Sequence, residues 1–525
     1  MKTEEEYDVV VVGSGAAGMT AALTAAHHGF SAVVIEREKR YGGSTARSGG
    51  GLWLPGPEAS TYLKHVAGDE VAPARRDALL AYGPEVLAFV EKHTPLEFAR
   101  VPGYPDYHPE APGGLAEGRT VEPRPLDVRR IGADLETLAP PYRAAPNGMA
   151  VTAVDYRWLS LGMRHPRSAL TAVRLAASRF RGHRLTMGQA LAAGLRAGLR
   201  RAGVPVLLDT PMTGLDVDEG RVAAVRSGAR RWRARRGVVL ASGGFERNER
   251  MRREHQDLGT EWTVGAPGNI GDGIVMGREL GAALDLMDEA WWGPSLPLTG
   301  GPYFCLAERN LPGSLMVDGS GRRFVNESAP YVDVVHVMLG RRTGTPHLPS
   351  WLITDRTYRD RYLFAGRAPR TPLPRRWFDA GVAHRADTVE GLAASIGVPP
   401  EELRRTVERF NGFAASGRDD DFGRGDSAYD RYYGDPRQRP NPCLGPLLKP
   451  PFHAFALVPG DLGTKGGLRT DERARVLRPD GTPVPGLYAA GNTSASVMGR
   501  GYAGAGATLG PAMTFGYLAA LDLAG

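Results

Sequence analysis

Short runs of apolar residues mark the buried strands of this chain, and stretches with apolar positions three and four residues apart mark its helices. Residues 7–12, 32–35 and 238–241 are the clearest strand candidates, because each is a compact run rich in valine. An alanine-rich helix is expected between the first two, ending near Gly29. Residues 187–202 predict another helix, and residues 204–227 predict strands joined by a Glu-Gly turn.

The turn after the first strand carries the strongest local signal. Gly13, Gly15 and Gly18 form G-x-G-x-x-G between a strand and a helix, and Glu36 ends the second strand. In dinucleotide-binding units such glycines allow a tight turn and admit the pyrophosphate to the helix N-terminus, and an acid about 20 residues later binds a ribose hydroxyl. The combination predicts dinucleotide binding rather than a purely structural glycine turn.

A second loop, YGGSTARSGGG at residues 41–51, is rich in glycine and small hydroxyl residues. A ligand longer than NAD, such as FAD, would need a second backbone cradle of this kind; the alternative is a flexible surface loop. We therefore expect FAD. The candidate FAD contacts are Gly13, Ser14, Gly15, Ala16, Ala17, Gly18, Glu36, Arg37, Gly42, Gly43, Ser44, Ser48, Gly49, Gly50, Met212, Ala241, Ser242, Gly243, Gly491, Asn492, Gly506, Thr508 and Leu509.

The remaining pattern predicts how the domains are arranged. Residues 58–100 predict amphipathic helices, and residues 101–147, rich in proline, glycine and tyrosine, predict an ordered loop. Residues from about 290 to 455 show no repeated βαβ pattern, whereas a strand, a glycine turn and a final helix return after residue 486. We expect an α/β fold in which a Rossmann-like FAD-binding domain, residues 1–288 and 459–525, is assembled from both chain ends around an inserted α+β catalytic domain, residues 289–458.

The amino-acid composition limits the cellular compartment and the kinds of partner that we expect. The chain has 525 residues, 42% of them hydrophobic and 23% charged, which is typical of globular proteins of more than one domain. Its net charge of +7 comes from scattered arginines without a nucleic-acid-binding motif. The two cysteines stand alone and form no disulfide framework, and no residues have metal-ligand spacing. The acidic N-terminus continues directly into a predicted strand, unlike a signal peptide. We expect a cytoplasmic protein without a metal, a nucleic-acid partner or a signal peptide.

Several longer motifs carry a family resemblance. They are GGSTARSGGGLWLPGP, PDYHPEAPGG, DYRWL, GRRFVNESAPY, DFGRGDSAYDRYYGDP, DLGTKGGLRTDE and GLYAAGNTSASVMGRGYAGAGATLGPAMTFGY. Together they resemble the flavoprotein superfamily of fumarate reductase and succinate dehydrogenase. Within it, the chain is similar to the 3-ketosteroid Δ1-dehydrogenases over essentially its whole length.

The resemblance implies FAD-dependent removal of two hydrogens from the C1–C2 bond of a 3-ketosteroid, with the electrons passed to an external acceptor such as a quinone. It implies that Tyr331 takes the C2 proton, that Tyr107 supports it, and that Tyr502 and the Gly506 N–H polarise the C3 ketone. Free tyrosine has a pKa of about 10, so a hydrogen bond from Tyr107 is expected to lower the pKa of the base. Alanines at 503 and 505 replace prolines that are common in the family, which predicts a looser turn.

Three other functions fit parts of the pattern. A fumarate-type ene-reductase would need converging arginines and histidines, and the tyrosine in the C-terminal loop disfavours it. A related desaturase acting at C4–C5, or on another cyclic ketone, is left open by the motifs. A flavin-holding binding protein without turnover is disfavoured because all four proposed active-site positions are retained.

The second glycine loop also predicts how FAD is attached. Ser44 occupies the place where covalent members of the superfamily carry a histidine, so FAD is expected to be non-covalent.

One further segment predicts an amphipathic helix. Residues 164–185 have Leu170, Val173, Ala177 and Phe180 at helical spacing and a basic stripe of Arg167, Arg174 and Arg181. This segment either rests peripherally on a membrane or is a solvated helix packed on its own domain.

Overall fold

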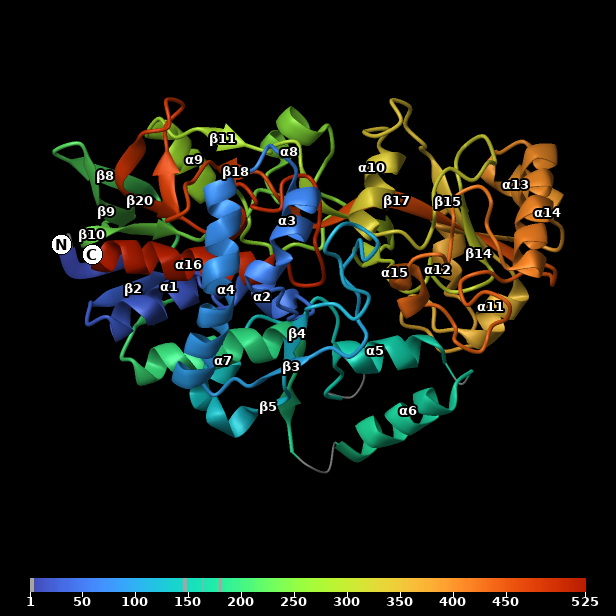
Figure 1. The fold of residues 1–525 in the computed structure, drawn as a ribbon, viewed down its shortest axis with the longest axis horizontal. Coiled ribbons are helices and arrows are strands. Elements are labelled where there is room, and N and C mark those ends of the chain that lie inside the picture. Colours follow the sequence, from blue (N-terminus) through green and yellow to red (C-terminus); the bar gives the residue numbers. More distant parts are fainter. Residues whose placement is uncertain (1–3, 145–148, 163, 179–181) are drawn as a thin grey trace.

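The computed structural model describes residues 4–144, 149–162, 164–178 and 182–525, and it forms two lobes (Figure 1). The lobe drawn at the left holds an eight-stranded sheet, and the lobe at the right holds a six-stranded one. The helices are α1 Ala16–His27, α2 Gly43–Arg47, α3 Ser60–Ala67, α4 Pro73–His93, α5 Ala153–Ser160, α6 Pro166–Ser178, α7 Met187–Arg201, α8 Glu249–Gln256, α9 Asp272–Glu279, α10 Tyr331–Met338, α11 Arg356–Arg361, α12 Arg375–Asp379, α13 Val389–Ile396, α14 Pro400–Ser416, α15 Ala428–Tyr432 and α16 Leu509–Ala524.

The larger sheet has the order β19-β20-β10-β1-β2-β7, with β8 and β9 continuing from β10. Its strands are β1 Glu4–Val12, β2 Ala32–Ile35, β7 Val206–Leu207, β8 Gly214–Asp218, β9 Arg221–Ser227, β10 Arg230–Leu240, β19 Arg475–Leu477 and β20 Pro483–Ala489. Strands β7, β2, β1, β10 and β20 are parallel neighbours. Because β1, β10 and β20 pair directly, residues from both chain ends build one sheet, as predicted.

The two faces of this sheet follow from the alternation of side chains along β1. Val9 and Val11 point into the main core, where α1 packs against α7 and α16. Val10 and Val12 point to the opposite face, into a separate core that includes Trp232. Both faces are covered, which explains why β1 is an uninterrupted apolar run.

The second sheet has the order β13-β12-β17-β15-β14, with β16 also paired to β17, and all its pairs are antiparallel. Its strands are β12 Ala290–Leu296, β13 Tyr303–Phe304, β14 Ser314–Val317, β15 Ser350–Thr354, β16 Ala383–Ala386 and β17 Phe452–Thr464. One face packs on α13 and α14 through side chains such as Leu315 and Ile353. Leu352, on the opposite face, joins the main core, and α10 packs against β12.

Short strands complete the fold: β3 Phe98–Arg100, β4 Val121–Pro123, β5 Leu126–Asp127, β6 Arg184–Leu185, β11 Leu284–Asp285 and β18 Gly467–Leu468. Two of these, β4 and β5, lie with two short 3-10 helices in residues 101–147, which sequence predicted as loop. The final helix begins at Leu509, close to the prediction. The antiparallel second sheet between the two halves of the first supports the inserted α+β arrangement, while the exact domain boundaries stay a prediction.

Candidate active site

The first glycine turn lies at the carboxyl end of β1. The backbone N–H and the hydroxyl of Ser14 both donate to the Glu36 carboxylate, at 3.0 and 2.6 Å, and the Ser14 hydroxyl accepts from the Gly42 N–H at 3.0 Å. Ser14 thus links the first glycine turn, the end of β2 and the second glycine loop, the three segments that the sequence predicted to bind FAD. Burial raises the pKa of Glu36, and a further donor, such as a ribose hydroxyl, would stabilise its charged form.

These residues fit an FAD. Gly15 is the N-cap of α1 and has no side chain to cap it; the Ala16 N–H donates to Thr45 Oγ1 at 2.9 Å, and the positive end of the helix favours a phosphate. At Gly43 and Gly49 an added Cβ would meet no atom of the described residues within 4 Å, so this loop borders space that a ligand can fill. At Gly13, by contrast, a Cβ would lie 2.3 Å from the Ala241 carbonyl oxygen, because the turn packs on the end of β10.

A small cavity lies along the C-terminal loop and the start of α16. Its lining includes Trp291, Asn492 and Thr508. Gly491, also in the lining, lies beside the first turn of α1, since its added Cβ would be 3.3 Å from the Ala17 Cβ. The predicted contacts on β1, β10, α1 and the C-terminal loop are therefore brought together.

Two predicted FAD contacts have other partners in the structure. The Arg37 guanidinium pairs with Asp272 at 3.3 Å, and Met212 is buried in the core behind the sheet.

Three tyrosines from distant parts of the sequence meet at one point. The Tyr107 hydroxyl donates to the Tyr331 oxygen at 3.0 Å across 224 positions of sequence. Tyr502 completes the group: its ring centroid lies 5.0 Å from that of Tyr107 and 5.5 Å from that of Tyr331. All three side chains are buried. The three catalytic tyrosines expected from the sequence thus form a single cluster.

The protonation of this cluster differs from the expectation. Burial raises the pKa of Tyr331 well above its usual range, and the hydrogen bond from Tyr107 lowers it by less than burial raises it. Burial also raises the pKa values of Tyr107 and Tyr502. The hydrogen bond from Tyr107 thus lowers the pKa of Tyr331 as predicted, but the net pKa is raised, because burial takes water from a phenolate without giving it a positive partner.

The turn that carries Tyr502 is pressed against other backbone. At Gly506, which has a φ of +91°, an added Cβ would lie 2.4 Å from the carbonyl of Gly51. At Gly501 it would lie 2.2 Å from the Val66 carbonyl oxygen. The Tyr502 hydroxyl lies 3.1 Å from Thr508 Oγ1. Among the hydrogen bonds of the described residues, the Gly506 N–H has no acceptor, so it is free for a substrate oxygen.

The alanines of this turn are held from outside. The Ala503 carbonyl accepts from the Tyr62 hydroxyl at 2.6 Å and from the Tyr107 N–H at 3.0 Å. The Ala505 carbonyl accepts from Thr120 Oγ1 at 2.8 Å. These bonds restrain the backbone at both alanines, and the predicted looser turn stays a prediction.

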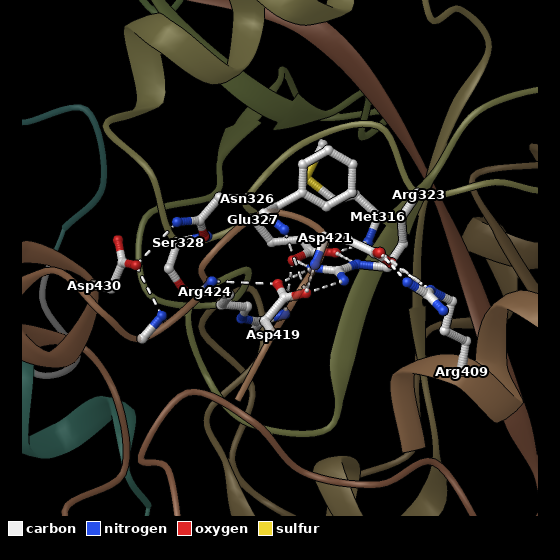
Figure 2. A network of polar contacts seen from close by, with 12 residues as sticks. Met316, Arg323, Asn326, Glu327, Ser328, Arg409, Asp419, Asp421, Arg424 and Asp430 are labelled. Carbon is white, nitrogen blue, oxygen red and sulfur yellow. Dashed lines mark hydrogen bonds and ion pairs between the residues drawn. The ribbon is translucent and has the colours of Figure 1, made fainter. Parts of the chain in front are cut away.

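The loop that precedes Tyr331 is fixed by a buried charge network (Figure 2). Glu327 accepts from Arg323, Arg424 and the Met316 N–H, at 2.8, 3.2 and 3.1 Å. Arg323 also pairs with Asp419 at 2.8 Å. These side chains are almost completely buried, and each charge has an opposite partner, so the loop cannot move without exposing an unpaired buried charge.

Sequence reasoning gave no role to several aromatic residues around the cluster. Tyr429 lies 4.8 Å from Tyr107, Phe304 lies 5.0 Å from Tyr331, and Trp291 lies 4.8 Å from Tyr502, all between ring centroids. The aromatic-rich stretch AYDRYY around Tyr429 was the only available signal. Trp291 both packs on Tyr502 and lines the cavity.

The chain is similar in sequence to known FAD-binding proteins. A family described as "FAD binding domain" matches residues 8–509. The chain is 53% identical to a 3-oxosteroid 1-dehydrogenase of Mycolicibacterium smegmatis, over 99% of this chain and 98% of that protein. It is 37% identical to a 4-oxocyclohexanecarboxylate 2-dehydrogenase of Sinomonas cyclohexanicum, over 99% and 93% of the two chains.

Among solved structures, the chain is similar to the 3-ketosteroid Δ1-dehydrogenase of Sterolibacterium denitrificans in complex with 1,4-androstadiene-3,17-dione. The TM-score is 0.93, the sequence identity is 39%, and 99% of each chain is covered.

The second glycine loop generates a prediction on cofactor attachment. Ser44 Oγ accepts from the Asn269 amide at 2.9 Å, and a serine hydroxyl there offers no nucleophile comparable with a histidine. Acid precipitation of the purified protein should release all of its flavin into the supernatant, measured by absorbance. Yellow colour left on the washed pellet would show a covalent bond and contradict the prediction.

Proposed function

The chain belongs to the FAD-dependent 3-oxosteroid 1-dehydrogenase family, and from this premise we propose how its own residues remove two hydrogens from the C1–C2 bond of a 3-ketosteroid. The observation that carries the proposal is the buried cluster of Tyr107, Tyr331 and Tyr502. It offers a proton acceptor and a separate hydrogen-bond donor within one site.

Tyr331 acts as the base that takes the proton from C2. Its oxygen accepts a hydrogen bond from Tyr107, which would stabilise a phenolate and keep the lone pair oriented. Because burial raises the pKa of Tyr331, the phenolate is a strong base once it forms. Tyr107 is thus a support for the base rather than a second base.

Tyr502 and the Gly506 N–H bind the C3 ketone oxygen. Removal of a proton next to a ketone builds negative charge on that oxygen, and two donors aimed at it act as an oxyanion hole does. Burial raises the pKa of Tyr502, so its hydroxyl keeps its proton and remains a donor at neutral pH.

The residues of the two glycine turns would hold FAD, which would supply the acceptor for the second hydrogen, leaving C1 as hydride. The surrounding aromatic side chains, including Trp291 and Phe304, exclude water from this transfer. The electrons then leave to an external acceptor of the quinone type.

Action on a smaller cyclic ketone is the second candidate, because a relative at 37% identity is named for 4-oxocyclohexanecarboxylate. Anaerobic addition of androst-4-ene-3,17-dione or of 4-oxocyclohexanecarboxylate separates the two. Bleaching of the flavin absorbance by the steroid and not by the carboxylate supports the proposal. Bleaching by the carboxylate and not by the steroid would show that the smaller cyclic ketone is the substrate.

The two tyrosine roles predict different losses. Tyr331→Phe should nearly abolish flavin reduction by steroid while leaving steroid binding largely intact, because only the proton acceptor is gone. Tyr502→Phe should slow reduction by about 100- to 1000-fold and weaken binding, because an oxyanion-hole donor is lost. Stopped-flow reduction and steroid titration measure both effects. A Tyr331→Phe enzyme that reduces its flavin at the wild-type rate would show that another group is the base.

The raised pKa of Tyr331 predicts a dependence on pH. A base that is protonated at neutral pH becomes more available as pH rises, so the rate of flavin reduction should increase by about tenfold per unit between about pH 6 and pH 9. Tyr502→Phe keeps the base and should show the same slope at a lower rate. A rate independent of pH over this range would mean that the base is already ionised.

Peripheral membrane contact is a further part of the proposal. On α6, Leu170 and Val173 are 68% and 66% exposed, while the side packed on the protein carries Ser168, Thr171 and Leu175. Ala177 is also exposed. The helix lies at the lower edge of the molecule (Figure 1). Its exposed apolar side chains favour contact with a membrane, where a steroid partitions.

Two residues of the predicted face and stripe, Phe180 and Arg181, lie outside the described residues. Arg167 is exposed, and Arg174 pairs with Asp155. No helix among the described residues is long and apolar enough to cross a bilayer.

The exposed face of α6 predicts binding to vesicles. The double change Leu170→Glu and Val173→Glu should reduce flotation with anionic liposomes, because it removes the apolar contact. The matched control is Val217→Glu, which alters a 51% exposed apolar residue on β8 and should float as the wild type does. Equal flotation of all three proteins would contradict membrane contact through α6.

A further inference from the structure

The carboxylate of Glu289 lies at the junction of three structural elements. The residue directly precedes β12, and its side chain is only 1% exposed. One oxygen accepts from Arg500 at 2.8 Å and from Arg341 at 2.9 Å. The other accepts from Trp292 Nε1 at 3.1 Å and lies 3.0 Å from His336 Nε2.

These partners lead to both reacting tyrosines. His336 lies on α10, the helix whose first residue is Tyr331. Arg500 lies two positions before Tyr502 in the C-terminal turn. One carboxylate therefore bonds the segment that carries the base and the segment that carries the ketone donor.

Other charges strengthen this junction. The buried Lys465 ammonium donates to the Arg500 and Gly501 carbonyls at 3.0 and 2.6 Å, and it lies 4.7 Å from the centre of the Trp291 ring. Arg500 also pairs with Asp288 at 2.7 Å. Lys465 thus binds the backbone immediately before Tyr502, and the Arg500 side chain anchors the same segment to Asp288 and Glu289.

Glu289 stays ionised in this environment. Burial acts to raise its pKa, but the hydrogen bond and charge of His336, together with Lys465 and Arg341, lower it to about 2. Asp333, on α10, is a further acidic group that faces Lys465. Glu289 therefore keeps its charge at neutral pH, whereas burial lowers the pKa of Lys465 to about 8.

We propose that Glu289 is a positioning residue that sets the distance between the base Tyr331 and the ketone donor Tyr502. The proposal rests on the roles given above to these tyrosines, which act on adjacent substrate carbons, C2 and C3. Because both must reach one rigid ring at once, a shift between their segments misaligns the C2–H bond. A misplacement of about 1 Å can cost about 100-fold in rate.

Glu289→Gln tests this on the complete flavoprotein, because it keeps the shape and removes the charge. We expect flavin reduction to slow by about 10- to 100-fold. The steroid dissociation constant should change little, since both tyrosines are still present. The primary isotope effect with steroid deuterated at C2 should rise, because a displaced base makes cleavage of that bond limiting.

Arg500→Gln, at a side chain that is 45% exposed, gives a second variant that removes only one arm of the junction. It should slow reduction and weaken steroid binding, because it loosens the Tyr502 side. Asp435→Asn is the matched control: this buried carboxylate accepts from Arg164 and Tyr362 at 3.0 and 2.8 Å, and among the described residues it has no hydrogen bond to Tyr331 or Tyr502. It should leave the isotope effect unchanged.

Two results would overturn the inference: wild-type rates and isotope effects in both Glu289→Gln and Arg500→Gln, or an equal loss in Asp435→Asn. A wild-type enzyme that steroid does not reduce would instead overturn the proposed function, and this inference with it.

Discussion

Contact of bare backbone between the C-terminal turn and residues 51–67 is the constraint on which the active site depends. The glycines of this turn leave no room for a side chain, so carbonyls and amides from distant segments approach within van der Waals distance. This contact places Tyr502 beside Tyr107 and sets α16 next to α1. A larger residue at these glycines would clash with the facing backbone and displace the turn that carries Tyr502.

The second feature of the site is that its tyrosines and the charged groups around them are buried. The tyrosines lie in a buried region, and the charged groups that hold their segments are paired around Glu327 and Glu289. The tyrosines thus have a low-dielectric surrounding, and their segments are held by ion pairs that solvent does not screen.

The sequence predicted the parts of the fold that local patterns encode. The run of valines in β1, the spacing of the three glycines and the position of Glu36 determine a strand, a turn and a neighbouring strand within 36 residues, and the structure has them where expected. The tyrosine roles came from the family resemblance, because nothing local distinguishes Tyr331 from the other tyrosines. The junction at Glu289 could not be predicted, because its partners are up to 211 positions away and resemble ordinary surface charges in sequence.

The pairing of β1 with β10 and of β10 with β20 also has a consequence for synthesis on the ribosome. The second lobe lies entirely between these strands, so its antiparallel sheet can form while the first sheet still lacks an edge. The exposed edge of β10 stays without its parallel neighbour until residues 483–489 leave the exit tunnel. A nascent chain that stalls before that point would present an unpaired, apolar strand edge to other chains, which makes late translation the stage most exposed to aggregation and to chaperone capture.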